Sequence, residues 1–349
     1  MKMIWLLLFF SCVAAGTVKD DTKVPIVGVL TLHISKNKHY PRHSTYLYTS
    51  YGKWLEESGI RWIPILLYDS QRTIRKKLDM VNGVLLTGGS EPLGTEKRPS
   101  RYSRVLKTIV KYAEDKNDEG VNYPIFGICM GFEGLLSTLT CHKAHLKDID
   151  NDNKSLGIHF TDECKDSLFN TTFSMDDLQD IKDKNLFYFH HHHGYLMDDL
   201  NEIPYVRDNI KILGTNGDSA KGDILTIFQH RYYPFFATQF HPEKIQFEYF
   251  DDAEINNSDL AIQTARKMSK LFKNMLGQCK AHISNKRVLR FREGVELAVE
   301  YNKADEAYIF KPRKRRRKRH RIVYKQRESF SSEDWGSETD SSQSDAQDE

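Results

Sequence analysis

The sequence predicts an α/β protein in which a mostly parallel central sheet is covered by helices on both faces, a three-layer sandwich. Apolar segments of strand length alternate with amphipathic segments of helical spacing, which is typical of βαβ units. Because such crossovers are right-handed and join parallel strands, a parallel sheet follows. The predicted strands cover residues 25–32, 61–67, 83–87, 123–128, 224–230 and 233–240. The predicted helices cover residues 44–58, 100–116, 131–140 and 258–276.

Two segments add detail to this pattern. Pro64 lies inside the second predicted strand and has no N–H to donate to a neighbour, so we expect that strand at or near an edge of the sheet. Residues 145–220 are rich in Asp, Asn and Lys and show no clear alternation. We expect loops there, together with an added subelement that shapes the pocket.

The turn after the fourth strand carries the strongest chemical signal. Residues 126–132, Phe-Gly-Ile-Cys-Met-Gly-Phe, place Cys129 between an apolar strand and a helix, with glycines on both sides. Such a turn lifts a nucleophile out of a sheet edge, and the N-terminus of the following helix favours the thiolate. Cys129 is therefore a candidate nucleophile for acyl transfer. A core cysteine packed beside two glycines is the alternative interpretation.

His241 is the candidate base. An apolar strand over residues 233–240 ends at this histidine, and Pro242 stops the strand from continuing. Glu243 is close enough along the chain to orient the imidazole and stabilise its charged form. A lone histidine at a strand end is usually structural. Because His241 and Cys129 both follow predicted strands, at the edge where open α/β sheets place their sites, we interpret them with Glu243 as a Cys-His-Glu triad.

A third strand end completes the predicted site. The strand at residues 83–87 runs into a Gly88-Gly89 turn, where the bare backbone can approach a ligand closely. The amides of Gly89 and Met130 are a candidate oxyanion hole for a tetrahedral intermediate. Taken alone, this turn would be an ordinary tight loop.

The chain resembles the class I glutamine amidotransferase superfamily in three motifs and in their order. These are the Gly88-Gly89 turn, Gly-Ile-Cys-Met-Gly-Phe at residues 127–132 and Gln-Phe-His-Pro-Glu-Lys at residues 239–244. Within it the chain is most similar to the gamma-glutamyl hydrolases, through residues 25–30, 46–51, 54–59 and 82–90. The resemblance covers roughly residues 24–280 and implies the class I glutamine amidotransferase-like (flavodoxin-like) form of the three-layer fold.

The resemblance also implies an activity, namely a cysteine-type hydrolase that removes γ-linked glutamates from folate polyglutamates through a thioester. Cys129 would be the nucleophile, His241 the general base and Glu243 its partner, with no cofactor and no metal. The family uses a second histidine near the substrate, in a segment similar to residues 187–190. This chain has four histidines at 190–193, and we assign His190 because it directly follows the aromatic residues. An exposed polar loop or an adventitious metal site are the alternatives for this run.

The substrate's glutamate carboxylates have three candidate contacts in the sequence, Tyr46, Ser50 and Ser90. The family commonly forms homodimers, so the resemblance implies a homodimer here. Two other functions stay open. A glutamine amidotransferase-type amidase would share the Cys-His-Glu site but would need a synthetase domain or partner. A non-enzymatic protein would bind its partner through the basic tail.

The N-terminus predicts entry into the secretory pathway. Residues 1–16 combine Lys2, a short apolar core and small residues, the pattern of a signal peptide. That core is too short to span a bilayer, and no other run in the sequence is long enough. Glycosylation sequons begin at Asn153, Asn170 and Asn256. We expect an extracellular, lysosomal or vacuolar protein.

The C-terminal residues have opposed charge blocks. Residues 311–327 carry eleven Lys or Arg and no acid, and residues 328–349 carry eight Asp or Glu and no base. Such blocks cannot bury a core, so we expect disorder over residues 311–349. The basic block would indicate nucleic-acid binding in a cytosolic protein, but behind a signal peptide we expect no nucleic-acid partner. The predicted organisation is a signal peptide at 1–16, a catalytic domain at 24–282, an extension at 283–310 and a tail at 311–349.

Overall fold

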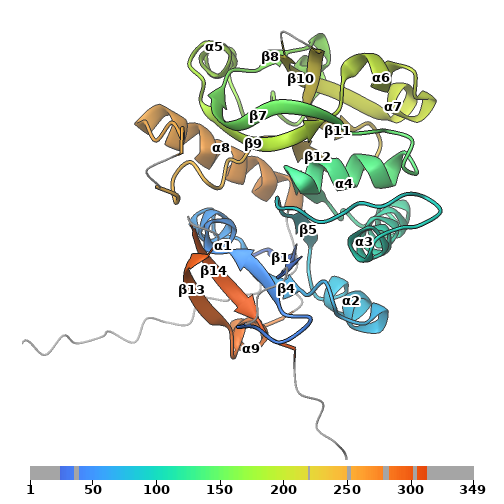
Figure 1. The fold of residues 1–349 in the computed structure, drawn as a ribbon, viewed down its shortest axis with the longest axis vertical. Helices are drawn as coiled ribbons and strands as arrows, with labels where there is room; N and C mark the ends of the chain where they lie inside the picture. Colours follow the sequence, from blue (N-terminus) through green and yellow to red (C-terminus); the bar gives the residue numbers. More distant parts are fainter. Residues whose placement is uncertain are drawn as a thin grey trace, which may run out of the picture. The chain divides into compact units, whose positions relative to one another are not determined.

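The helices and strands of the computed structural model follow the order predicted from the sequence, with further elements between them (Figure 1). The structure describes residues 24–34, 39–218, 221–249, 253–277, 283–301 and 305–312. The predicted signal peptide and residues 313–349 lie outside the described residues.

The strands are β1 (Ile26–Leu30), β2 (Leu32–His33), β3 (Thr45–Tyr48), β4 (Arg61–Ile65), β5 (Gly83–Leu86), β6 (Ile125–Ile128), β7 (Lys147–Leu156), β8 (His159–Phe160), β9 (Phe187–Gly194), β10 (Ile210–Asp218), β11 (Gly222–His230), β12 (Phe235–Thr238), β13 (Glu296–Tyr301) and β14 (Asp305–Phe310). The helices are α1 (Thr49–Glu57), α2 (Gln71–Leu78), α3 (Arg101–Asp118), α4 (Met130–Leu139), α5 (Met175–Asp183), α6 (Met197–Asn201), α7 (Pro204–Asn209), α8 (Asp259–Leu276) and α9 (Asn285–Arg292).

The central sheet has the strand order β4-β1-β5-β6-β12-β11-β10-β8 in the described part of the chain. Its strands pair in parallel from β4 through to β12, and the pairings from β12 to β8 are antiparallel. The mostly parallel sheet is therefore confirmed. The prediction for Pro64 is also confirmed, because β4 is the outermost strand at one edge.

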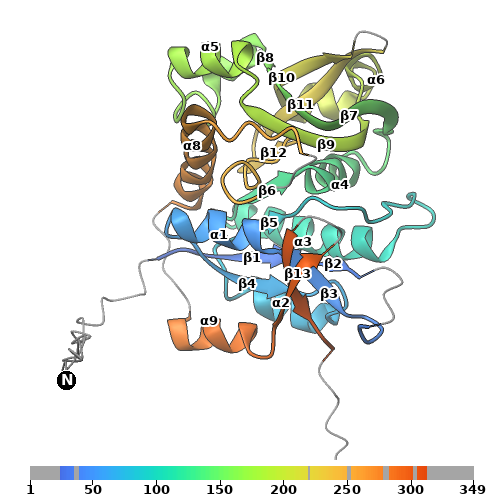
Figure 2. The same cartoon turned by 60° about the vertical axis from the view of Figure 1, so that its left-hand side comes forward.

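Both faces of this sheet are buried under helices, which confirms the three-layer sandwich (Figure 2). In β1, Ile26 and Leu30 belong to the core that includes apolar side chains of α2, α3 and α4. Val27 and Val29 point to the opposite face and belong to the core shared with α1 and α8. This alternation follows from the two-residue period of a strand, and burial on both faces explains why the strand is continuously apolar.

The prediction of a helix over residues 44–58 is wrong in its first turn. Residues 45–48 form β3, and α1 begins only at Thr49. The reason is tertiary pairing: β3 lies between β2 and β14 in a small sheet of order β13-β14-β3-β2. In Figure 1 the C-terminal strands β13 and β14, in orange, lie beside the blue α1. Segment 283–310 thus adds α9, which packs against β4, and strands β13 and β14, of which β14 contacts α1.

The subelement expected within residues 145–220 is present. Strands β7 and β9 form a two-stranded antiparallel ribbon of their own. Both views place the ribbon next to α4 (Figures 1 and 2). Because α4 begins directly after Cys129, the ribbon lies over the predicted nucleophile.

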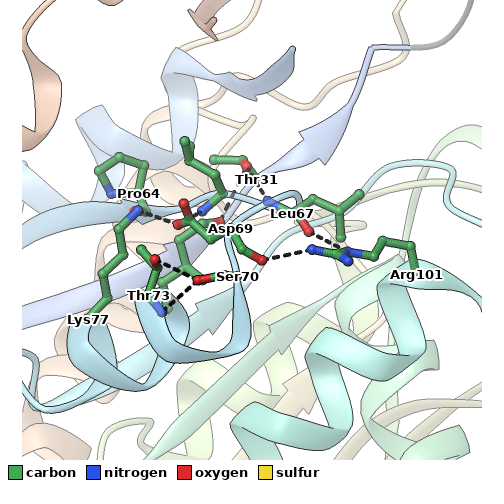
Figure 3. Close-up of polar contacts among 10 residues, drawn as sticks. Thr31, Pro64, Leu67, Asp69, Ser70, Thr73, Lys77 and Arg101 are labelled. Carbon is green, nitrogen blue, oxygen red and sulfur yellow. Dashed lines mark hydrogen bonds and ion pairs between the residues drawn. The ribbon is translucent and has the colours of Figure 1, made fainter. Parts of the chain in front are cut away.

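A buried polar cluster fixes the loop that follows β4 (Figure 3). Lys77 of α2 donates from Nζ to Asp69 Oδ2 and to the carbonyl oxygen of Pro64, each at 2.6 Å. Arg101, at the start of α3, donates to the carbonyl oxygens of Leu67 and Asp69 at 3.0 and 2.7 Å. The cluster joins β4, α2 and α3 where β4 ends. It therefore holds together the side of the sheet at which the parallel strands have their carboxyl ends, and the candidate site lies on that side.

Candidate functional site

Cys129 occupies the sharp turn between β6 and α4. Its backbone has φ 52° and ψ −113°, and a positive φ is unfavourable for a residue with a side chain. Its N–H donates to the carbonyl oxygen of Thr238 at the end of the neighbouring β12. The predicted strand–turn–helix is confirmed, and the strained conformation is the one that a nucleophile elbow uses.

The surroundings of Cys129 favour the thiol over the thiolate. Burial raises its pKa well above the usual value for cysteine, and the carboxyls of Glu133 and Glu243 raise it further. Hydrogen bonds from the Met130 and Gly89 amides act in the opposite direction. The helix N-terminus, from which the sequence predicts a thiolate, acts against this desolvation; the thiolate stays a prediction.

His241 and Glu243 form a buried hydrogen-bonded pair. His241 Nδ1 lies 2.7 Å from Glu243 Oε1, and both side chains are almost fully buried. An imidazole that donates from Nδ1 to a carboxylate presents Nε2 as an acceptor. Nε2 is buried and has no hydrogen-bond partner among the described residues. Burial lowers the pKa of His241 well below its usual value, so the resting ring is neutral and can accept a proton.

Gly88 shows how close the nucleophile and the base lie to each other. A Cβ placed on Gly88 would lie 2.6 Å from His241 Cε1 and 3.0 Å from Cys129 Cβ. The two candidate residues therefore border the same small space, which only glycine leaves free. The structure brings together Cys129, His241 and Glu243 from the ends of two neighbouring strands, β6 and β12.

Tyr51 of α1 is part of this site, although the sequence did not single it out. Its hydroxyl oxygen accepts the Gly88 N–H at 2.7 Å. The same hydroxyl interacts with the Glu243 carboxyl and partly offsets the effect of burial, which raises the pKa of Glu243 to about 7. The pKa of Tyr51 itself is raised well above its usual value by burial, so its hydroxyl keeps its proton. Tyr51 thus connects the Gly-Gly turn to the carboxylate behind His241.

The predicted oxyanion amides lie beside the sulfur. Gly89 has φ +148°, and a Cβ there would lie 2.1 Å from Leu32 Cδ1, so this position requires glycine. The N–H groups of Gly89 and Met130 both act to lower the pKa of the Cys129 thiol, which places both amides close to the sulfur. An oxyanion hole needs two such donors beside the carbonyl carbon that the nucleophile attacks; this role of the two amides stays a prediction.

The β7–β9 ribbon brings His190 to the nucleophile. Cys129 Sγ donates to the His190 carbonyl oxygen at 3.9 Å, and the half-exposed His190 ring lies 2.8 Å from Asp152 of β7. His191 points into the interior instead, where burial lowers its pKa to about 4. His192 and His193 are exposed on the ribbon. His190 stays the predicted substrate-side histidine.

The three predicted carboxylate contacts lie in two places. A Cβ on Gly89 would lie 3.5 Å from the Tyr46 hydroxyl, and Ser90 is exposed directly after the turn. Ser50 lies instead in a separate pocket of about 260 Å³ at the start of α1. Tyr46 and Ser90 are therefore near the oxyanion amides, and Ser50 is one residue from Tyr51. Their contact with substrate stays a prediction.

Two buried polar residues next to the triad were also missed. Glu133, one turn into α4, accepts from Gln239 Nε2 at 3.1 Å, and burial raises the pKa of Glu133 to about 7. Gln239 lies two residues before His241, so this contact connects the helix of the nucleophile to the strand of the base. A charged residue in an otherwise apolar helix turn was the signal available in the sequence.

The three sequons lie in different surroundings. Asn170 is exposed, with its Nδ2 donating to the Lys165 carbonyl oxygen. Asn153 Oδ1 accepts from the Tyr188 hydroxyl at 2.9 Å, and Asn256 is half-buried. Asn170 therefore offers the most accessible side chain of the three; modification at any of them stays a prediction.

No group of three or more His, Cys, Asp or Glu side chains within the described residues is arranged to hold a metal ion. None of the described helices combines the length and apolar character needed to cross a membrane.

Comparison with known proteins gives consistent matches. The family model for glutamine amidotransferase class-I matches residues 51–256. The gamma-glutamyl hydrolase of Mus musculus is 30% identical over 263 residues, which cover 72% of this chain and 81% of the mouse protein. The probable gamma-glutamyl hydrolase 3 of Arabidopsis thaliana is 28% identical over 253 residues, covering 69% and 70% of the two chains. Gamma-glutamyl hydrolase B of Dictyostelium discoideum is 25% identical over 250 residues, covering 72% and 71%.

Proposed function

The chain belongs to the gamma-glutamyl hydrolase family, within the class I glutamine amidotransferases, and from this premise we propose that it hydrolyses the γ-glutamyl bonds of folate polyglutamates. One observation carries the proposal. Cys129 sits on a strained turn that shares a small space at Gly88 with His241, which is held by Glu243. A thiol, a neutral imidazole and a carboxylate in this arrangement support cysteine-type acyl transfer.

The first half of the reaction forms a thioester. The substrate carbonyl oxygen accepts hydrogen bonds from the Gly89 and Met130 amides. His241 Nε2 takes the Cys129 proton as the sulfur attacks the carbonyl carbon, and Glu243 stabilises the resulting imidazolium. When the tetrahedral intermediate collapses, the C–N bond breaks and His241 gives its proton to the departing amine. An oxyanion donor of this kind contributes about 3 kcal/mol to stabilising the transition state.

The second half releases the acid. His241 removes a proton from water, whose oxygen attacks the thioester carbonyl, and the proton returns to sulfur as the C–S bond breaks. The burial of His241 beside Glu243 suits this step. Burial lowers the pKa of His241 and so favours the neutral imidazole, which is the form that accepts a proton. Tyr46, Ser50 and Ser90 are the side chains proposed to contact the glutamate carboxylates, and His190 is the histidine proposed to lie near the substrate.

The location and assembly of the chain are part of the same proposal. A signal peptide at residues 1–16 and the sequons support passage through the secretory pathway to an extracellular, lysosomal or vacuolar site. We propose a small-molecule substrate, no nucleic-acid partner and a homodimeric assembly, as the family resemblance implies.

A glutamine amidotransferase-type amidase is the second candidate, favoured by the family model that matches residues 51–256. It would use the same Cys129 and His241 but would release ammonia from free glutamine. Comparing free glutamine with a γ-glutamyl folate as substrate separates the two functions.

The experiment that tests the proposal follows products by mass. Pteroylpentaglutamate is incubated with the wild-type protein and with Cys129→Ala at mildly acidic and at neutral pH. We expect shortened folates from the wild type only, and the order in which products appear separates endo from exo cleavage. A folded wild-type protein that leaves the pentaglutamate intact at both pH values would refute the proposed function.

A further inference from the structure

A polar pocket of about 260 Å³ adjoins the candidate active site at the start of α1. It is lined by Thr49, Ser50 and Lys53 of α1, by residues 247–249 and by Glu306 of β14. Tyr51, from the same helical turn, hydrogen bonds to the Gly88 N–H beside the nucleophile. The pocket therefore lies one residue along α1 from Tyr51, and none of the proposed catalytic residues lines it.

The α1 side of the pocket is suited to an anion. Tyr48 caps α1 without a side-chain hydrogen bond to the first turn, and that turn contains no acidic residue of its own, so the positive end of the helix dipole favours an anion here. Ser50 is 2% exposed, and its buried hydroxyl has no hydrogen-bond partner within the described structure. Lys53 supplies a cation. A hydroxyl donor, an ammonium group and a helix start together fit a carboxylate.

A carboxylate of the chain itself already contacts these groups. Glu306 Oε2 lies 2.9 Å from Lys53 Nζ and accepts from Thr49 Oγ1 at 3.4 Å. These contacts with Lys53 lower the pKa of Glu306, so it is ionised under all ordinary assay conditions. The second acid lining the pocket, Glu248, has its own buried partner in Lys244. Glu306 is therefore the acid that neutralises Lys53.

We propose that this pocket is a subsite for an α-carboxylate of the γ-glutamyl chain, and that Glu306 of the C-terminal strand competes with the substrate for it. The proposal rests on the proposed function. Each residue of a γ-linked glutamate chain has a free α-carboxylate, while its nitrogen is acylated, so the chain offers anions to such a pocket and no ammonium group. The C-terminal hairpin then sets how tightly polyglutamate chains bind.

The test compares KM and kcat for pteroylpentaglutamate in Glu306→Gln, Lys53→Met and the double variant. Because Lys53 and Glu306 are about 40% exposed, the effects are those of a surface pair, roughly two- to five-fold. We expect Glu306→Gln to lower KM by about that factor with kcat unchanged, and Lys53→Met to raise it. In the Lys53→Met background, Glu306→Gln should change KM little, and added salt should reduce every difference.

A matched control exists in the same hairpin. Glu296 of β13 pairs with Lys311 and is similarly exposed, at 45%, but it does not line the pocket. Glu296→Gln should leave KM unchanged. Calorimetric titration of pteroylpentaglutamate into Cys129→Ala, with and without Glu306→Gln, measures the same affinity change without turnover.

The outcomes separate the subsite from the function. Cleavage by all forms with equal KM, or an equal shift in Glu296→Gln, would overturn the subsite and leave the hydrolase assignment standing. If neither the wild type nor any variant cleaves the pentaglutamate, the proposed function fails, and the subsite proposal fails with it.

Discussion

Tyr51→Phe removes one hydroxyl group that serves two parts of the candidate site. The hydroxyl oxygen accepts the Gly88 N–H at 2.7 Å, and the hydroxyl interacts with the carboxyl of Glu243. The ring of Tyr51 is buried, and phenylalanine keeps its volume, so packing is preserved. The variant therefore tests the polar contacts alone.

The expected effect follows from these two contacts. The hydroxyl lowers the pKa of Glu243 less than Lys244 does, and Glu243 Oε2 has no hydrogen-bond partner among the described residues. We therefore take the lower part of the range for a hydrogen bond, about 0.7 kcal/mol, which corresponds to about half a pH unit or three-fold in rate. Glu243 has to be ionised to stabilise the imidazolium, so activity falls as pH decreases through its pKa of about 7. Because the Tyr51 hydroxyl lowers that pKa, its loss should move the acid limb of the pH profile upward.

The assay is the pH dependence of kcat/KM for a γ-glutamyl folate. We expect the acid limb of Tyr51→Phe to shift by about half a unit to higher pH and the rate at pH 6 to fall about three-fold. The orphaned Gly88 N–H should also reduce the free energy of unfolding by about 1–3 kcal/mol. An unshifted acid limb with wild-type activity would refute the role given to Tyr51. Lower stability alone, with an unchanged profile, would limit Tyr51 to a structural role.

Three further predictions concern the nucleophile, the space at Gly88 and the buried cluster of Figure 3. Cys129→Ala should abolish hydrolysis while leaving the circular dichroism spectrum unchanged; residual turnover would point to another nucleophile. Gly88→Ala should lower kcat at least about 100-fold, because the added methyl would lie 2.6 Å from His241 Cε1 and misplacement by an ångström has that effect; near-normal kcat would contradict the packing. Lys77→Met should cost about 3 kcal/mol in urea unfolding, because Asp69 loses its buried partner; a loss under about 1 kcal/mol would mean that the pair behaves as an exposed one.

The sequence predicts the candidate site where that site depends on residues that end strands. Glycines around Cys129 and the proline after His241 mark strand ends, and the strands themselves are continuously apolar. Since parallel strands bring their carboxyl ends to one edge, residues 112 positions apart could be placed together before the structure was known.

Contacts that depend on distant pairing could not be found in this way. Tyr51 has the spacing of a core residue on α1, and nothing in its neighbourhood points to Gly88. The spacing of residues 45–48 predicts a helix, because their strand partners, β2 and β14, leave no local signal. The effect of burial on the pKa of Cys129 also has no local signal, since the helix N-terminus alone favours the thiolate.

The measurement that tests the central claim most directly is mass spectrometry of the protein quenched in acid during turnover of pteroylpentaglutamate. We predict an adduct on the peptide that contains Cys129, formed by the wild type and removed by hydroxylamine, as expected of a thioester. Its mass is that of a pteroyl group with one or more glutamates, according to which γ bond is cleaved. Hydrolysis that proceeds with an adduct on a different residue, or that continues in Cys129→Ala, would contradict it.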